Sequence, residues 1–242
     1  MRYAVIAAGE GSRLRQEGVA EPKPLVKIGG ECLIDRLLRV FMQNGAEEIW
    51  VVCNDRWPAV GRHLQRVQHE GLGGRSIPLN YMVKNTPSSM HSFYELSTHL
   101  QGGPFILTTV DTIFREKEFA DYLNCFRQRL REGFDGVMGV TNYIDDEKPL
   151  YVATDAYSNI TGFYDAYKKG IEYISGGIYG LKGTSLDTLN GCMARGESRM
   201  RNFQRALIAD GRRLKAFAFS KVLDIDHKED IAKAETFINP SE

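Results

Sequence analysis

YAVIAAGEGSRL, residues 3–14, is the stretch that decides the fold, and EPKPL, residues 21–25, follows it closely. Residues 3–6 form a short apolar run, which is typical of a strand buried on both faces. Gly9 and Gly11 then allow the backbone to bend tightly and to approach a ligand. Consecutive N–H groups in such a bend form a nest for an anion. The stretch therefore predicts a buried strand followed by an anion-binding turn.

Two cationic side chains accompany this turn. Arg13 carries a planar guanidinium group that suits phosphate oxygens. Lys23 lies between Pro22 and Pro24, and the prolines restrict the backbone on both sides of it. We expect both cations to meet phosphate groups. The alternative is an ordinary strand and turn with a chance arginine, because glycine pairs most often mark turns.

The spacing excludes two common phosphate loops. A dinucleotide fold requires G-x-G-x-x-G, but Leu14 stands third after Gly11. The P-loop pattern G-x-x-x-x-G-K-[ST] does not occur in the sequence. These absences disfavour an NAD-dependent oxidoreductase and a P-loop NTPase.

Together, AAGEGSRL and PKPL resemble the signature A-A-G-x-G-[ST]-R-[LM] … P-K-P-L of the sugar-phosphate nucleotidyltransferases, the GT-A-like enzymes that make nucleoside-diphosphate sugars. The resemblance is close over the first forty residues and looser beyond them. It implies that an NTP is bound by the turn, with Arg13 on the β- and γ-phosphates and Lys23 on the α-phosphate. The turn residues that it assigns to the nucleotide are Ala8, Gly9, Gly11 and Ser12.

The composition describes an ordinary globular chain. The 242 residues are 43% hydrophobic and carry 31 basic and 31 acidic side chains, whereas a nucleic-acid-binding protein usually has a basic excess. The four cysteines are widely spaced and show no zinc or disulfide pattern. No leader and no apolar run long enough to span a bilayer is found. We expect a cytoplasmic protein without nucleic-acid or membrane partners; a homo-oligomer remains open.

Hydrophobic periodicity predicts an α/β fold with a doubly wound, mostly parallel, Rossmann-like sheet. Predicted helices cover 33–44, 58–68, 90–100, 116–131, 185–193, 199–209 and 231–237, and further strands cover 48–53, 79–83, 104–110, 136–141, 150–156, 160–164, 173–181 and 214–219. The short runs after residue 150 predict a small antiparallel insertion. We expect one domain over 1–242, in which 1–145 bind the NTP and 146–242 bind the acceptor and complete a metal site.

Nucleotidyl transfer requires a divalent cation, and Mg²⁺ prefers one or two carboxylates. Asp111 follows a predicted strand, at the edge where α/β sheets bind ligands. The segment from Asp224 to Ile231 resembles the closing D-[IV]-D-T-P-E-D-L of the family, with His227-Lys228 in place of Thr-Pro. The resemblance assigns Mg²⁺ to Asp111 and Asp226, with Asp224 as the alternate. The competing interpretation of Asp111 and Asp226 is helix capping.

Three further segments are assigned by the resemblance. Ser88 and Ser89 stand where the family contacts the base or ribose, although both also suit the N-cap of the next helix. Ser175 and Gly177 match the segment that contacts the acceptor sugar, and Gly177 could instead mark a bulge. The family's E-K-P is missing, and Lys168, or its neighbour Lys169, is the candidate for the acceptor phosphate; the alternative is a solvated turn.

The predicted reaction moves an NMP from an NTP onto a phosphorylated acceptor, with release of pyrophosphate. A sugar 1-phosphate is the first candidate acceptor, and a small phospho-alcohol such as phosphocholine, used with CTP, is the second. A catalytically inactive module that senses a nucleotide or a sugar is the third interpretation, because the acceptor motifs depart from the family pattern at Ser175, at E-K-P and at His227-Lys228.

Overall fold

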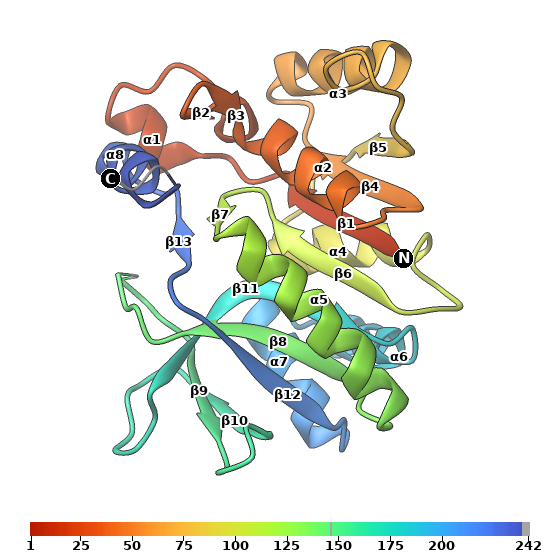
Figure 1. Ribbon diagram of the computed structural model, residues 1–242, viewed down its shortest axis with the longest axis vertical. Coiled ribbons are helices and arrows are strands. Elements are labelled where there is room, and N and C mark those ends of the chain that lie inside the picture. The colour runs from red at the N-terminus through yellow and green to blue at the C-terminus, as the bar shows by residue number, and fades with distance from the viewer. Residues whose placement is uncertain (146, 239–242) are drawn as a thin grey trace.

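Strands and helices alternate along the first half of the chain, as Figure 1 shows for the computed structural model, which describes residues 1–145 and 147–238. The strands are β1 (Arg2–Ala7), β2 (Lys27–Ile28), β3 (Glu31–Cys32), β4 (Glu48–Cys53), β5 (Leu79–Val83), β6 (Phe105–Thr109), β7 (Thr112–Ile113), β8 (Gly136–Thr141), β9 (Tyr151–Thr154), β10 (Ile160–Tyr164), β11 (Tyr173–Leu181), β12 (Leu214–Phe219) and β13 (Leu223–Asp224). The helices are α1 (Ser12–Gln16), the 3₁₀ turn η1 (Lys23–Leu25), α2 (Leu33–Gln43), α3 (Pro58–Glu70), α4 (Ser89–Ser97), α5 (Glu116–Arg131), α6 (Ser185–Ala194), α7 (Met200–Ala209) and α8 (Lys228–Ile238).

The main sheet is built outward from β1. This strand lies between β4 and β6 and is parallel to both, and β5 continues the parallel array beyond β4. Tyr3, Ala4 and Val5 are fully buried, as an apolar strand in the middle of a parallel sheet should be. The parallel strands β1, β4 and β6 end at the same edge, which is where ligands bind in such sheets.

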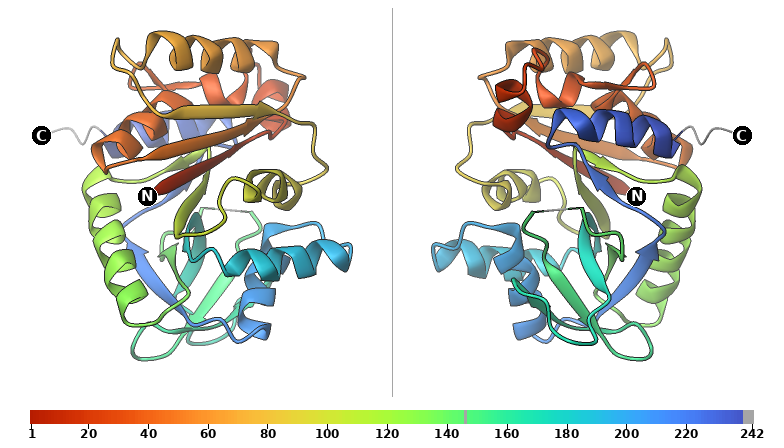
Figure 2. Two further views of the ribbon diagram at one scale, coloured as in Figure 1. Left: turned by 90° about the vertical axis from the view of Figure 1, so that its right-hand side faces the viewer. Right: turned by 90° about the vertical axis from the view of Figure 1, so that its left-hand side faces the viewer.

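Helices cover both faces of this sheet (Figure 2). The core on one face contains apolar side chains of α2, α3, α5 and α8, and the core on the other contains those of α4, α6 and α7. The predicted doubly wound α/β fold is therefore confirmed. None of the helices in the described ranges is both long and apolar enough to cross a membrane.

The second half adds antiparallel strands, as expected. β11 is antiparallel to β6, β8 and β9, and the β9–β10 hairpin extends the sheet beyond it. The pairing of β11 with β8 is irregular between Ser175 and Ile178, where Gly177 has a φ of +69°. A left-handed backbone favours glycine, so the predicted bulge at Gly177 is confirmed.

Four short elements were not predicted: α1, η1, the β2–β3 hairpin and the β7–β13 pair. Each is too short to show a hydrophobic period. The β7–β13 pair joins Thr112 and Ile113 to Leu223 and Asp224, so only the tertiary fold can form it. This pair places the segment that contains Asp226 beside the carboxyl end of β6.

Candidate active site

The turn after β1 runs close to Lys23. Gly11 has a φ of +61°, and a Cβ atom at Gly11 would lie 3.3 Å from the Cβ of Lys23. An L-residue would be strained by the backbone and crowded by the neighbouring side chain. Gly11 therefore permits the close approach of the two segments that the sequence signature contains.

Lys23 lies between two carboxylates. Its Nζ is 2.7 Å from Oδ2 of Asp111 and 2.6 Å from Oδ1 of Asp226, and its side chain is 10% exposed. Burial alone would lower the pKa of Lys23, but the negative charges of Asp111 and Asp226 outweigh burial and raise it. Burial alone would raise the pKa of Asp111, and the Lys23 charge reverses that effect and lowers it. Lys23 is therefore held as an ammonium ion beside an ionised Asp111, and its Nζ also donates to Asp226.

Arg13 completes this charge cluster from α1. Its Nη1 lies 2.8 Å from Oδ2 of Asp226, and its Nη2 lies 3.7 Å from Oε2 of Glu147. Asp226 thus accepts hydrogen bonds from both predicted phosphate-binding cations. The side chains of Arg13 and Lys23 therefore converge on one carboxylate from two different segments.

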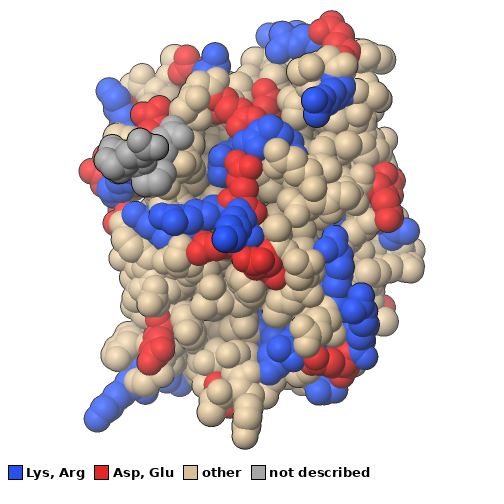
Figure 3. Space-filling view, viewed as in Figure 1, with Lys and Arg blue, Asp and Glu red and all other residues tan. Residues whose placement is uncertain are grey.

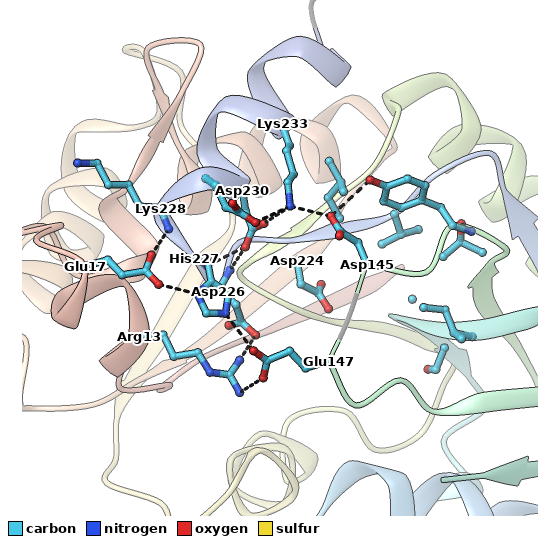
Figure 4. A pocket seen from close by; sticks show the side chains of 18 residues that line it. Arg13, Glu17, Asp145, Glu147, Asp224, Asp226, His227, Lys228, Asp230 and Lys233 are labelled. Atoms are coloured by element: carbon cyan, nitrogen blue, oxygen red, sulfur yellow. Dashed lines mark hydrogen bonds and ion pairs between the residues drawn. The ribbon is translucent and has the colours of Figure 1, made fainter. Parts of the chain in front are cut away.

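Asp226 does not cap α8. Its backbone N–H and that of His227 both donate to Oδ2 of Asp230, at 3.1 and 2.7 Å. The capping carboxylate is therefore that of Asp230, and the carboxylate of Asp226 points toward Arg13 (Figure 4) and also accepts a hydrogen bond from Lys23. Oδ1 of Asp224 lies 3.5 Å from Oγ1 of Thr112, and of the two candidates Asp226 is the one that shares Lys23 with Asp111.

A cavity of about 350 Å³ lies between the turn after β1 and the start of α4. Six residues that the sequence assigned to the site line it: Ala8, Gly9, Lys23, Ser88, Ser89 and Asp111. Ser88 also caps α4, because its Oγ accepts a hydrogen bond from the N–H of His91 at 3.5 Å. The capping interpretation of Ser88 is confirmed, and a ligand role for either serine stays a prediction.

A second cavity, of about 830 Å³, lies on the other side of Asp226 and is drawn in Figure 4. Arg13, Ser175, Gly176, Asp224 and Asp226 contribute to its walls. Among the residues that the structure describes, which leave out residue 146, the walls contain seven carboxylates and four basic groups. The carboxylates are Glu17, Asp145, Glu147, Asp224, Asp226, Glu229 and Asp230, and the basic groups are Arg13, His227, Lys228 and Lys233.

The side chain of Ser175, in the wall of this second cavity, is held by a hydrogen bond to a side chain of α7. Its Oγ lies 3.0 Å from Oε1 of Gln204 on α7, and Nε2 of Gln204 lies 3.4 Å from the hydroxyl of Tyr179. Gln204 and Tyr179 are buried. Sequence analysis missed Gln204 because a lone glutamine in an amphipathic helix carries no signal of contact with a distant strand.

Lys168 is not brought to either cavity. Its ammonium lies 3.5 Å from the centroid of the Tyr164 ring, at an exposed turn, and it is not among the residues that line the two cavities. The structure therefore gives no support to Lys168 as the acceptor-phosphate residue. The positive groups at the second cavity are Arg13, Lys228 and Lys233 instead.

The loop that carries Asp226 is also tied to α1. Nδ1 of His227 lies 2.6 Å from Oε1 of Glu17, and the N–H of Lys228 donates to Oε2 of Glu17 at 2.7 Å. The hydrogen bond to Glu17 raises the pKa of His227. At these two positions, where the family has Thr-Pro, the turn is instead fixed by the contacts of His227 and of the Lys228 backbone with Glu17.

Comparison with known proteins is consistent with this geometry. Residues 3–241 match the nucleotidyl transferase family, so the chain belongs to that family. A mannose-1-phosphate guanyltransferase of Schizosaccharomyces pombe is 26% identical over 197 residues, which are 78% of this chain and 52% of that protein. The chain thus spans about half the length of this curated relative.

Two solved structures share the fold. One is assigned as a glucose-1-phosphate thymidylyltransferase and comes from Bacillus anthracis. Its TM-score is 0.83 at 16% identity, and the alignment covers 100% of this chain and 98% of the Bacillus anthracis chain. The other, the inositol-1-phosphate CTP transferase of T. maritima, has a TM-score of 0.73 at 19% identity, with 98% and 97% covered. At these identities the likeness shows the fold alone.

Proposed function

We propose that this protein is a Mg²⁺-dependent nucleotidyltransferase that moves an NMP from an NTP onto a phosphorylated acceptor. The observation that carries the proposal is the position of Lys23, between Asp111 and Asp226 at the carboxyl edge of the parallel strands. A buried cation held by two carboxylates marks a place where the local charges suit a divalent ion and a triphosphate together.

In the proposed reaction a phosphate oxygen of the acceptor attacks the α-phosphorus of the NTP. A bond forms between that oxygen and the α-phosphorus, the bond from the α-phosphorus to the bridging oxygen breaks, and pyrophosphate leaves. The second pKa of a phosphomonoester is about 6, so the acceptor is already ionised at neutral pH and needs no general base. Positioning and charge neutralisation then provide catalysis.

The chain supplies the neutralising charges from two directions. Lys23 would contact the α-phosphate, and Arg13 would contact the β- and γ-phosphates. Both cations must leave Asp226 to do so, because they share its carboxylate in the structure. Asp111 and Asp226 would hold Mg²⁺, which when bound offsets the negative charge of the triphosphate.

The two halves of the chain divide the substrates. We assign the NTP to the cavity beside the turn of β1, which residues 1–145 line, and the acceptor to the cavity beyond Asp226. A sugar 1-phosphate is the first candidate acceptor, in line with the names of the relatives. Ser175, on β11, lines this cavity and would contact the acceptor, whereas at the next positions Gly176 and not Gly177 is among the lining residues.

A second candidate acceptor is a phospho-alcohol with a cationic head group, such as phosphocholine. The excess of carboxylates over basic groups among the described residues of the second cavity suits such a head group, because carboxylates attract an ammonium ion. Figure 3 shows that, on the face drawn, Lys and Arg are interspersed with Asp and Glu and form no broad basic surface, so nothing there suggests a nucleic-acid partner.

Pyrophosphate release tests the proposal. The protein would be mixed with Mg²⁺, each of the four common NTPs or dTTP, and a panel of sugar 1-phosphates, inositol 1-phosphate, phosphocholine and phosphoethanolamine. We expect release with one NTP and one acceptor class, and loss of release in Lys23→Ala but not in Lys27→Ala, an exposed lysine on β2. Tight NTP binding without release for any pair would instead indicate the inactive, sensing module.

A further inference from the structure

Asn54 is a buried polar residue next to the turn after β1. The mechanism above does not use Asn54. It directly follows β4 and is 6% exposed. Its Nδ2 donates a hydrogen bond to the carbonyl oxygen of Ala8 at 2.8 Å and approaches that of Gly9 at 3.4 Å. One side-chain amide thus holds two successive carbonyls of the turn.

These two contacts of Asn54 determine the direction in which the N–H groups of the turn point. All peptide bonds in the described residues are trans, so each carbonyl is antiparallel to the N–H of the following residue. When the carbonyls of Ala8 and Gly9 face Asn54, the N–H groups of Gly9 and Glu10 face away from it. Within residues 1–145 and 147–238 neither N–H donates a hydrogen bond to the protein. Asn54 therefore presents two unpaired donors on the side opposite to itself.

The amide of Asn54 can work in one orientation only. Its Oδ1 is buried and has no hydrogen-bond partner among the described residues. A reversed amide would place Oδ1 against the two carbonyl oxygens of Ala8 and Gly9, where acceptors would repel one another. Buried polar groups without partners are rare in folded proteins. The structure leaves the Oδ1 of Asn54 unpaired so that the Nδ2 can hold the turn.

We propose that Asn54 is a positioning residue for the triphosphate: it fixes the turn so that the N–H groups of Gly9 and Glu10 are ready for phosphate oxygens before the nucleotide arrives. The inference rests on the proposed function, since it requires that an NTP binds at this turn. Asn54 acts through the backbone of Ala8 and Gly9 and need not touch the nucleotide.

The test uses a substitution of the same shape. Asn54→Asp replaces the Nδ2 donor by an oxygen, which repels the carbonyls of Ala8 and Gly9. We expect the Kd for the NTP, measured by titration calorimetry with Mg²⁺ and without acceptor, to rise by about tenfold or more, as the loss of one preorganising hydrogen bond to a binding loop predicts. Steady-state kinetics should show the KM for NTP rising while the KM for the acceptor stays unchanged.

Asn44 provides a matched control. Its Nδ2 also donates to a backbone carbonyl, that of Val40 at 2.8 Å, but at the end of α2. Asn44→Asp should change thermal stability without changing the Kd for NTP. Asn54→Ser is the second variant, to be used if Asn54→Asp does not fold; its hydroxyl is too short to hold two carbonyls, and we expect it to weaken NTP binding as well.

The outcomes separate the inference from the proposed function. If the wild-type protein binds NTP and the folded Asn54 variants bind it equally well, the positioning role is wrong and the function stands. A rise of both KM values together would mean that Asn54 only stabilises the fold. If the wild-type protein binds no NTP, the proposed function fails and the role of Asn54 fails with it.

Discussion

The Nζ of Lys23 lies 2.7 Å from Oδ2 of Asp111, although 88 residues separate them. The relationship joins the EPKPL segment to the end of β6, and it places the predicted α-phosphate cation beside a predicted metal ligand. The side chains of Lys23 and Asp111 open toward the same cavity. A single centre is therefore assembled from segments that the sequence motif alone does not connect.

Loss of the Lys23 ammonium should reduce turnover strongly. Lys23→Met keeps the length of the side chain and removes its charge, and we expect kcat to fall by about 10²-fold or more, by analogy with the removal of one preorganised donor. Pyrophosphate release at saturating NTP measures this. Lys27→Met is the control for a general effect of a lysine substitution, and unchanged kcat in Lys23→Met would contradict the role.

Asp226 should matter more than Asp224 for the metal. Asp226 shares Lys23 with Asp111, whereas Asp224 lies toward Thr112. We expect Asp226→Asn to raise the Mg²⁺ concentration for half-maximal activity by about tenfold or more and Asp224→Asn to change it less, since removing a carboxylate ligand weakens a hard-cation site. Mg²⁺ titrations at fixed NTP measure both. The reverse order would assign the second ligand to Asp224.

Gly11 should be required for activity, whereas Gly18 should matter for stability alone. Both have positive φ, so alanine at either position should cost roughly 1 kcal/mol of folding free energy. Only at Gly11 does the new Cβ meet Lys23, at 3.3 Å; at Gly18 it meets nothing within 4 Å. We expect Gly11→Ala to lower kcat/KM and Gly18→Ala to leave it unchanged. Equal kcat/KM values in the two variants would show that the contact with Lys23 is unimportant.

His227 should make stability depend on pH in one direction. The hydrogen bond to Glu17 is the main cause that raises the pKa of His227 above its ordinary 6.5, and Asp230 and Glu147 add to it. A raised folded-state pKa contributes stability that is complete below the unfolded value and is lost as the pH rises through the folded value. The difference in unfolding free energy between wild type and His227→Asn should therefore be larger at pH 5.5 than at pH 9.

Chemical denaturation at the two pH values measures this difference. His69→Asn, at an exposed position near the end of α3, is the matched control for a histidine substitution outside the loop of Asp226. A difference for His227→Asn that is constant with pH, or larger at pH 9, would show that the ion pair with Glu17 does not stabilise the folded protein.

Arg36 should be important for folding and not for chemistry. It is 7% exposed, its Nη1 lies 2.9 Å from Oε1 of Glu116, and its Nη2 donates to the carbonyl of Phe114 at 2.9 Å. Glu116 is partly exposed and keeps Arg39, but the carbonyl of Phe114 would lose its donor, so Arg36→Ala should cost about 1–3 kcal/mol of unfolding free energy. Arg62→Ala, at an exposed position on α3, should change it by less than about 0.5 kcal/mol. A small loss in Arg36→Ala would mean that Glu116 is satisfied by Arg39 alone.

Most of the fold could be predicted because long elements carry periodic signals. The strands at 48–53 and 173–181 and the helix at 116–131 appear with the predicted bounds. The predicted terminal helix began at residue 231, whereas α8 begins at Lys228. The first turn, residues 228–230, is charged and carries no apolar period, so the periodic pattern begins only at residue 231.

The site could be predicted only in part, for a physical reason. Lys23, Asp111 and Arg13 belong to local motifs, and the structure brings them together as the motif implies. Asn54 and Gln204 act through distant backbone and side-chain contacts, which no local pattern records. Lys168 was chosen because it follows the place of the missing E-K-P; its ammonium lies over the Tyr164 ring, and its role in acceptor binding stays a prediction.

The pairing of Lys23 with Asp226 spans 203 positions of the chain. The electrostatic balance at the centre therefore exists only while α8 and the β13 segment are docked against the first turn of the molecule. Undocking of that closing segment would remove one counter-charge from Lys23 and the nearer of two carboxylates from Arg13 at the same time, so both proposed phosphate-binding cations would be affected together.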